Sequence, residues 1–257
     1  MTEIAFMVRE DWAQWGTAMQ QSSETVREWL GASRPVWVVG KPEKFDDRVR
    51  SADRETAVYL SGSKSPSPVV GFDRIAEFAS HREATRLAVV ALHPYEDRDC
   101  DALRDLVDDC RVGKAYVQIW ARDDMVRHWL EGVGAIDLHA GSPTPAPDPL
   151  QVAACELMVN EEYNGLSTGN GKATVIQLLR SFAVEGYDLD ADAWLRAYFA
   201  AGGSFRHAGS IKKFVRELRQ GTRHRGAQRF KPEIVKILRE QITCGDTPPA
   251  RRVRGPR

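Results

Sequence analysis

The chain has 257 residues, of which 42% are hydrophobic and 28% are charged, and its 36 basic side chains balance 36 acidic ones. This length allows one large domain or two ordinary ones, and the hydrophobic content excludes a wholly disordered protein. No run approaches the roughly 18 apolar residues of a membrane-spanning helix, so we expect no membrane partner. Four widely spaced cysteines and an acidic N-terminus without signal-peptide features favour a cytoplasmic location.

Charge is distributed unevenly along the chain. Residues 1–150 carry a net charge of −7, residues 151–200 carry −4, and residues 201–257 carry +11. A basic end of this kind favours contact with a polyanion. It is equally compatible with docking on an acidic surface, either within this chain or on a protein partner.

The N-terminal half alternates short apolar runs with segments of helical periodicity. Apolar residues at helical spacing run from Trp12 to Trp29, and segment 41–56 is too short and too charged to assign. Apolar strands separated by helices predict an α/β domain over residues 1–140, with a mostly parallel sheet and Rossmann-like layers. The predicted strands lie at 36–39, 57–60, 87–92, 115–120 and 135–138, and the predicted helices at 72–82, 100–110 and 123–131.

The C-terminal half has the pattern of a helical domain. Proline at every second position from Pro143 to Pro149 predicts a semi-rigid linker over 141–150. Residues 151–243 predict a small all-α domain. Residues 244–257, with three prolines and four arginines, predict a disordered basic tail. The predicted helices lie at about 150–163, 171–185, 190–201, 204–220 and 231–242.

The residues after the predicted strands are candidates for binding and catalysis, because ligands of open parallel sheets bind beyond the carboxyl ends of the strands. His93 and His139 are candidate general bases, and Asp97 and Asp99 are carboxylates able to share a metal ion. Candidates for phosphate binding are Lys41, Ser61, Gly62, Ser63 and Lys64. For each group we favour a structural alternative, namely turn residues, satisfied histidines and carboxylates at a helix start. No metal site is predicted, and the cofactor is left unknown.

One stretch has a layout shared with a known family. Residues 36–121 place Gly40 after a strand, alternate helices with strands, and carry Asp97-Arg98-Asp99 near the third strand. This order resembles a Toprim domain, the metal-dependent phosphoryl-transfer module of primases and topoisomerases. The chain departs from that family at the catalytic positions, because Val38-Val39-Gly40 lacks the glutamate and His93-Pro94-Tyr95-Glu96 separates the aspartates from the strand. We therefore assign no family.

The segment 165–174 resembles a phosphate-binding loop but has the wrong spacing, since five residues separate its outer glycines and Ala173 follows Lys172. We interpret it as a loop that leads into a helix. A helix-turn-helix pattern around Gly202 and Gly203 is a weak match, because Tyr198 and Phe199 occupy positions that favour small residues.

The helix predicted over 204–220 has a basic face. Ile211, Phe214, Val215 and Leu218 recur at helical spacing and predict its core side. Arginine pairs bidentately with phosphate, so the opposite side favours contact with the backbone of duplex nucleic acid without sequence specificity. The basic residues are Arg206, Lys212, Lys213, Arg216, Arg219, Arg223, Arg225 and Arg229.

Three functions follow from these features. We favour a two-domain protein that associates with nucleic acid through its helical domain, while the α/β domain binds a ligand or a partner. The first alternative is a nucleotide-binding or phosphoryl-transfer enzyme with its site at the strand ends. The second alternative is an adaptor whose basic domain binds an acidic protein. The sequence leaves all three open.

Overall fold

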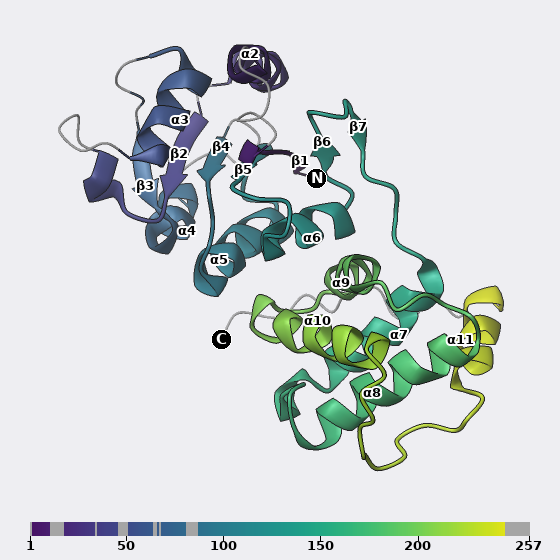
Figure 1. Ribbon diagram of the computed structural model, residues 1–257. Helices are drawn as coiled ribbons and strands as arrows, with labels where there is room; N and C mark the ends of the chain where they lie inside the picture. Colours follow the sequence, from purple (N-terminus) through teal and green to yellow (C-terminus); the bar gives the residue numbers. More distant parts are fainter. Residues whose placement is uncertain are drawn as a thin grey trace. The chain divides into compact units, whose positions relative to one another are not determined.

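The computed structural model describes residues 2–10, 18–33, 35–45, 51–63, 66, 68–80 and 87–244. The chain divides into two compact units, Met1–Thr144 and Pro145–Arg257 (Figure 1). The division falls inside the proline-rich segment 141–150. The residues predicted as a disordered tail lie outside the described part from 245 onward.

The first unit is built around a sheet whose described strands follow the order β3-β2-β4-β5-β1-β6-β7. Strands β1 to β6 pair in parallel, and β7 pairs antiparallel with β6. The predicted α/β class with a mostly parallel sheet is therefore confirmed. The strands are β1 (Glu3–Val8), β2 (Pro35–Val39), β3 (Val69–Gly71), β4 (Ala88–Leu92), β5 (Lys114–Ile119), β6 (Ile136–Asp137) and β7 (Ser142–Pro143).

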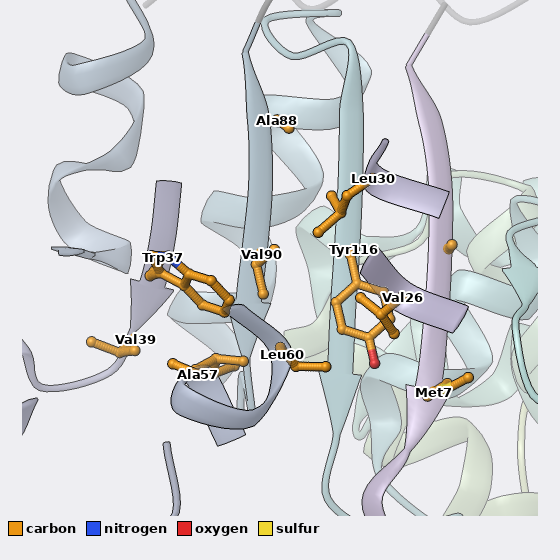
Figure 2. Close-up of a cluster of buried hydrophobic side chains, with 12 residues drawn as sticks. Met7, Val26, Leu30, Trp37, Val39, Ala57, Leu60, Ala88, Val90 and Tyr116 are labelled. Carbon is orange, nitrogen blue, oxygen red and sulfur yellow. The ribbon is translucent and has the colours of Figure 1, made fainter. Parts of the chain in front are cut away.

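Helices cover both faces of this sheet. On one face, Trp37, Val90 and Tyr116 pack with Val26 and Leu60 from two helices (Figure 2). The strand residues between them are buried too, because successive side chains of a strand point to opposite faces. Double burial explains why these strands read as continuous apolar runs. The first face is covered by α2 (Ala18–Leu30) and α3 (Ala52–Ser61), and the second by α4 (Ile75–Ser80), α5 (Asp97–Asp108) and α6 (Met125–Gly132) (Figure 1).

The strand predicted over 57–60 is wrong, because these residues belong to α3. Ser51 caps this helix by accepting a hydrogen bond from the Arg54 backbone N–H at 3.1 Å, and Gly62 ends it with a φ of +65°. A run of four apolar residues fits a buried helix face as well as a strand. The unassigned segment 41–56 contains a 3-10 turn, η1 (Pro42–Phe45), and the start of α3.

The sequence did not predict β1, which lies between β5 and β6 in the sheet. It also missed β3, which is followed by a second 3-10 turn, η2 (Phe72–Arg74). The predicted linker differs from the structure at both ends. Ser142 and Pro143 form β7, and Asp148 caps the next helix by accepting hydrogen bonds from the backbone N–H groups of Leu150 and Gln151. The irregular part of the linker is therefore short.

The described elements of the second unit are helices, and their bounds lie within three residues of the predicted ones. Phe182 packs edge-on against Trp194, with ring centroids 5.1 Å apart, and both side chains are fully buried. Segment 165–174 leads into α8, as interpreted from its spacing. The elements are α7 (Pro149–Asn160), η4 (Glu162–Asn164), α8 (Gly169–Val184), α9 (Ala191–Ala200), α10 (Phe205–Arg219) and α11 (Ile234–Thr243).

Candidate functional site

The sheet reverses its strand order between β2 and β4. These two strands are neighbours, but the chain leaves β2 for β3 on one side and leaves β4 for β5 on the other. Open α/β sheets bind ligands at such a reversal, beyond the carboxyl ends of the strands. Gly40 and Lys41 follow β2 and His93 follows β4, so the structure brings these predicted residues to one edge. We call it the β2–β4 edge.

His93 forms a close pair with a carboxylate at this edge. Its Nδ1 lies 2.6 Å from Oδ1 of Asp53, a residue in the first turn of α3. The His93 side chain is 9% exposed, and its Nε2 is buried without a hydrogen-bond partner in the described part of the chain. The φ of His93 is +50°, in the left-handed region that few residues with a side chain adopt.

An aromatic ring and an arginine complete the surroundings of His93. Trp120, directly after β5, meets the His93 ring edge-on with 4.9 Å between centroids. The Arg9 guanidinium lies 5.1 Å from the centroid of the Trp120 ring. Arg9 also donates hydrogen bonds to the Ala52 carbonyl oxygen, at 3.0 Å, and to the Thr56 hydroxyl. Arg9 thus ties the end of β1 to the start of α3, the turn that carries Asp53.

Sequence reasoning missed Asp53, Trp120 and Arg9. Asp53 was hidden because part of its helix was assigned as a strand, and Arg9 because β1 was not predicted. The sequence does contain a signal for the start of α3, because Ser51 followed by Asp53 and Glu55 is typical of the first turn of a helix.

The predicted carboxylates lie at the start of α5, where the structural alternative placed them. Asp97 is exposed, whereas the Asp99 side chain is only 14% exposed. A Cβ atom added to Gly40 would lie 3.8 Å from Oδ2 of Asp99, so this carboxyl group reaches the β2–β4 edge. Burial raises the pKa of Asp99, Arg98 opposes that shift, and Glu96 and Asp73 add to it. Neither Asp97 nor Asp99 is the N-cap residue, which is Glu96.

The described residues contain no group of three histidine, cysteine or acidic side chains able to hold a metal ion.

The predicted phosphate-binding residues do not gather at one edge. Ser61 ends α3, and Gly62 and Ser63 follow it, so they do not follow a strand as predicted. α3 starts beside His93, and a ten-residue helix is about 15 Å long, which puts Ser61 far from that edge. The Gly62 backbone N–H donates to the Val58 carbonyl oxygen and the Ser63 N–H to the Ser61 hydroxyl, so neither is available to an anion. Lys64 lies outside the described residues.

His139 is placed away from His93. It follows β6, which is separated from β4 by β1 and β5. Its side chain is exposed, and its backbone N–H donates to Oδ1 of Asp137 at 2.9 Å.

The second unit carries the predicted basic face. Ile211, Phe214 and Val215 of α10 are buried as expected, and Leu218 is half-buried. The side chains of five arginines on the other side of α10 and in the loop after it are exposed and form no hydrogen bond or ion pair with a described residue. We call them the arginine surface, and they are Arg206, Arg216, Arg219, Arg223 and Arg225.

The remaining predicted basic residues contact the protein itself. Arg229 binds Oε1 of Glu161 at 2.7 Å and is 31% exposed. Lys213 pairs with Glu217 one helical turn away, with 3.9 Å between the charged atoms. Lys212 is half-buried. Arg229 and Lys212 are therefore less available to a partner than the arginine surface, whereas the Lys213 side chain is 65% exposed.

The loop after α10 is held in place by residues that the sequence did not single out. Gln177 of α8 accepts hydrogen bonds from the backbone N–H groups of Arg229 and Phe230 and donates to the Phe230 carbonyl oxygen. Arg180 donates to the His224 carbonyl oxygen at 2.9 Å. The His224 ring packs edge-on against Phe214 of α10, with 5.6 Å between centroids. These contacts fix the backbone that presents Arg223 and Arg225.

No family model, curated protein or solved structure matches this chain. None of the helices in the described ranges has the length and apolar character needed to cross a membrane.

Proposed function

We propose that the helical unit binds the phosphate backbone of nucleic acid through the arginine surface. The observation that carries this proposal is that five exposed arginines lie on α10 and its following loop without a partner among the described residues. Arg229, in the same loop, differs from them because it pairs with Glu161 at 2.7 Å. We further propose that the unit from Pro145 onward is a separate all-α domain.

The chemistry of arginine supports a polyanionic partner. Its planar guanidinium presents parallel N–H donors that match two phosphate oxygens. Each phosphate that is neutralised releases bound counterions, which provides affinity without reading the base sequence. Both phenylalanines of α10 are buried, so neither offers a ring on which unpaired bases can stack. We therefore propose duplex nucleic acid as the partner.

The proposal is tested on the full chain by fluorescence anisotropy of a labelled duplex, as DNA and as RNA, over a salt series. The test variant is Arg216→Gln with Arg219→Gln. We expect it to bind more weakly. The slope of log K against log salt should become less negative by about 2, because each lost phosphate contact removes about 0.9 from the magnitude of the slope. The matched control is Lys236→Gln with Arg239→Gln, which removes the same charge from α11. The control should keep the salt slope of the unaltered chain.

Two results would contradict the proposal. Equal weakening by both double variants would mean that total charge matters rather than the arginine surface. Binding of poly-L-glutamate but of neither duplex would instead support an acidic protein partner.

A further inference from the structure

A cavity of about 420 Å³ lies between α8 and the loop that joins α10 to α11. Its wall on α8 includes Ala173, Ile176, Gln177, Arg180 and Ser181. These residues recur at i, i+3, i+4, i+7 and i+8, so they share one face of the helix. Sites that bind small molecules range from about 300 to 1,000 Å³. The cavity therefore has the size of a ligand site, and the helical unit alone supplies its walls.

Contacts at three points along α8 hold the loop over this face. The guanidinium of Arg180 donates to the His224 carbonyl oxygen at 2.9 Å, and the Gln177 side chain binds the backbone further along the loop. Between these points, a Cβ atom added to Gly226 would lie 3.6 Å from Cβ of Ala173, an ordinary van der Waals contact. The protein's own contacts thus fix the wall that the loop forms, so a ligand does not have to order it.

Two polar side chains of α8 line the cavity and can still form hydrogen bonds. Arg180 is exposed, and its contact with the His224 carbonyl oxygen uses one of its five N–H donors. It forms no ion pair with a described residue. The Ser181 side chain is half-buried, and its hydroxyl makes no hydrogen bond with a described residue. Both groups are therefore able to bind a ligand that enters from solvent.

The charges around the cavity favour an anion. Glu185, the acidic residue in its wall, lies 3.6 Å from the guanidinium of Arg239, which offsets its charge. Arg180 has no such partner in the described part of the chain. Further along the loop, the opposite charges of Lys231 and Glu233 balance, whereas the arginine surface adds positive charge to the same loop. The unbalanced charge at the cavity is therefore positive.

Much of the remaining wall is apolar. Ile176 of α8 is 4% exposed, and Pro232 lines the cavity from the loop. Val184, at the end of α8, also lines the cavity and is 86% exposed. A ligand with a hydrocarbon part would remove these side chains from water, which favours binding.

We propose that this cavity binds a small organic carboxylate, whose anionic group is held by Arg180 and the Ser181 hydroxyl while its hydrocarbon part lies against Ile176 and Pro232. A guanidinium presents parallel N–H donors that match the two oxygens of a carboxylate. One unpaired guanidinium balances one negative charge, which fits a carboxylate better than a doubly charged phosphate. This site does not depend on nucleic-acid binding, and it lies outside the β2–β4 edge.

The first test is an NMR titration of the full chain labelled with carbon-13 at the isoleucine δ1 methyl groups. Hexanoate, used as the probe, should shift the Ile176 signal in a saturable manner. Ile211, which is fully buried in α10 and does not line the cavity, is the internal control and should not shift. Hexylamine at equal ionic strength should bind at least about tenfold more weakly, because it offers Arg180 no acceptor. No saturable shift with hexanoate, or an equal response to hexylamine, would overturn the proposal.

A second test fills the cavity from the helix side. Ser181→Leu adds a large side chain that favours helix and removes the hydroxyl, without changing the residues that hold the loop. The matched control is Ala183→Leu, at an exposed position of α8 that does not line the cavity. The Kd of hexanoate should rise at least about tenfold in the first variant and stay unchanged in the control. Equal Kd values in the two variants would place the carboxylate outside this cavity and refute the proposal.

Arg180→Gln tests the charge directly. Loss of a hydrogen bond to a charged group should raise the Kd of hexanoate about tenfold. Lys236→Gln, which removes a charge from an exposed position of α11, is the control and should leave the Kd unchanged. Unchanged affinity in Arg180→Gln would show that this guanidinium does not hold the carboxylate. Circular dichroism of each variant verifies that the helical unit remains folded.

Discussion

Asp99 and His93 lie at the same sheet edge, but they differ in how their polar groups are satisfied. His93 has a carboxylate partner for one nitrogen, whereas burial of Asp99 leaves its carboxyl group poorly solvated, with Arg98 only 3.7 Å away as partial compensation. A raised pKa in the folded chain means that folding favours the protonated acid. The stabilising contribution of Asp99 is therefore fully present below its ordinary pKa of 3.8 and is lost as pH rises through its raised folded value.

This reasoning predicts the effect of Asp99→Asn. At neutral pH the neutral amide avoids the cost of burying a charge, so the variant should have a higher Tm than the unaltered chain. The difference should shrink as the pH falls through the raised pKa of Asp99, because Asp99 itself then becomes protonated. Thermal unfolding followed by circular dichroism across pH 3–8 measures both effects. Asp97→Asn, at an exposed position of the same helix turn, is the control, and a lower Tm for Asp99→Asn at neutral pH would refute the prediction.

At the scale of elements, the turn between α9 and α10 shows why two glycines stand together. Gly202 has a φ of +88°, which a side chain disfavours. Gly203 is required for another reason, because a Cβ atom there would overlap the Tyr198 ring. The Tyr198 hydroxyl donates to Oε1 of Glu162, which also accepts the Ser204 backbone N–H at 3.0 Å. The turn therefore couples the start of α10, which carries Arg206, to η4.

Two glycine-to-alanine substitutions separate these causes. Gly203→Ala should lower the free energy of unfolding by about 1–3 kcal/mol, the usual cost of overpacking a filled site. Gly209→Ala lies in mid-α10 with no atom within 4 Å of the added Cβ, and should raise it by about 0.5–1 kcal/mol because alanine favours helix. Urea unfolding measures both values. Equal effects of the two substitutions would show that the Tyr198 ring does not limit the turn.

At the scale of the whole molecule, the two compact units differ in architecture and in charge. The α/β unit carries most of the acidic excess, and the basic excess of +11 lies in residues 201–257. The second unit has its own aromatic core, in which Phe182, Trp194 and Phe199 are at most 1% exposed. A core of that kind is what an independently folding domain needs.

We predict that a fragment of residues 145–257 folds without the rest of the chain. Its far-ultraviolet circular dichroism should be helical, and its urea unfolding should be a single cooperative transition. A fragment of residues 161–257 is the control, since it lacks α7, which packs against α9 and α11. The shorter fragment should lose cooperative unfolding. A non-cooperative transition for the longer fragment would mean that the second unit depends on the first.

The sequence by itself determined the elements whose signals are local. The bounds of α8, α9 and α10 follow from apolar residues repeating at helical spacing and from glycines or cap residues at their ends, all within one segment. The basic character of α10 is equally visible, because a helix that buries Ile211 and Phe214 must turn its other face to solvent. Strands β2, β4, β5 and β6 were recognised for the same reason, whereas the run at 57–60 was wrongly assigned as a strand and β1 and β3 were missed.

Only the tertiary structure decided the features that join distant segments. β1 enters the sheet between β5 and β6, and no local pattern specifies which strands a segment will pair with. Asp53 and His93 are 40 residues apart, and Arg229 and Glu161 are 68 apart. One pair joins the start of α3 to the end of β4, and the other removes an arginine from the basic surface. Charge and periodicity along the chain predict which faces are buried or basic, but the pairing of individual side chains depends on how those faces meet in three dimensions.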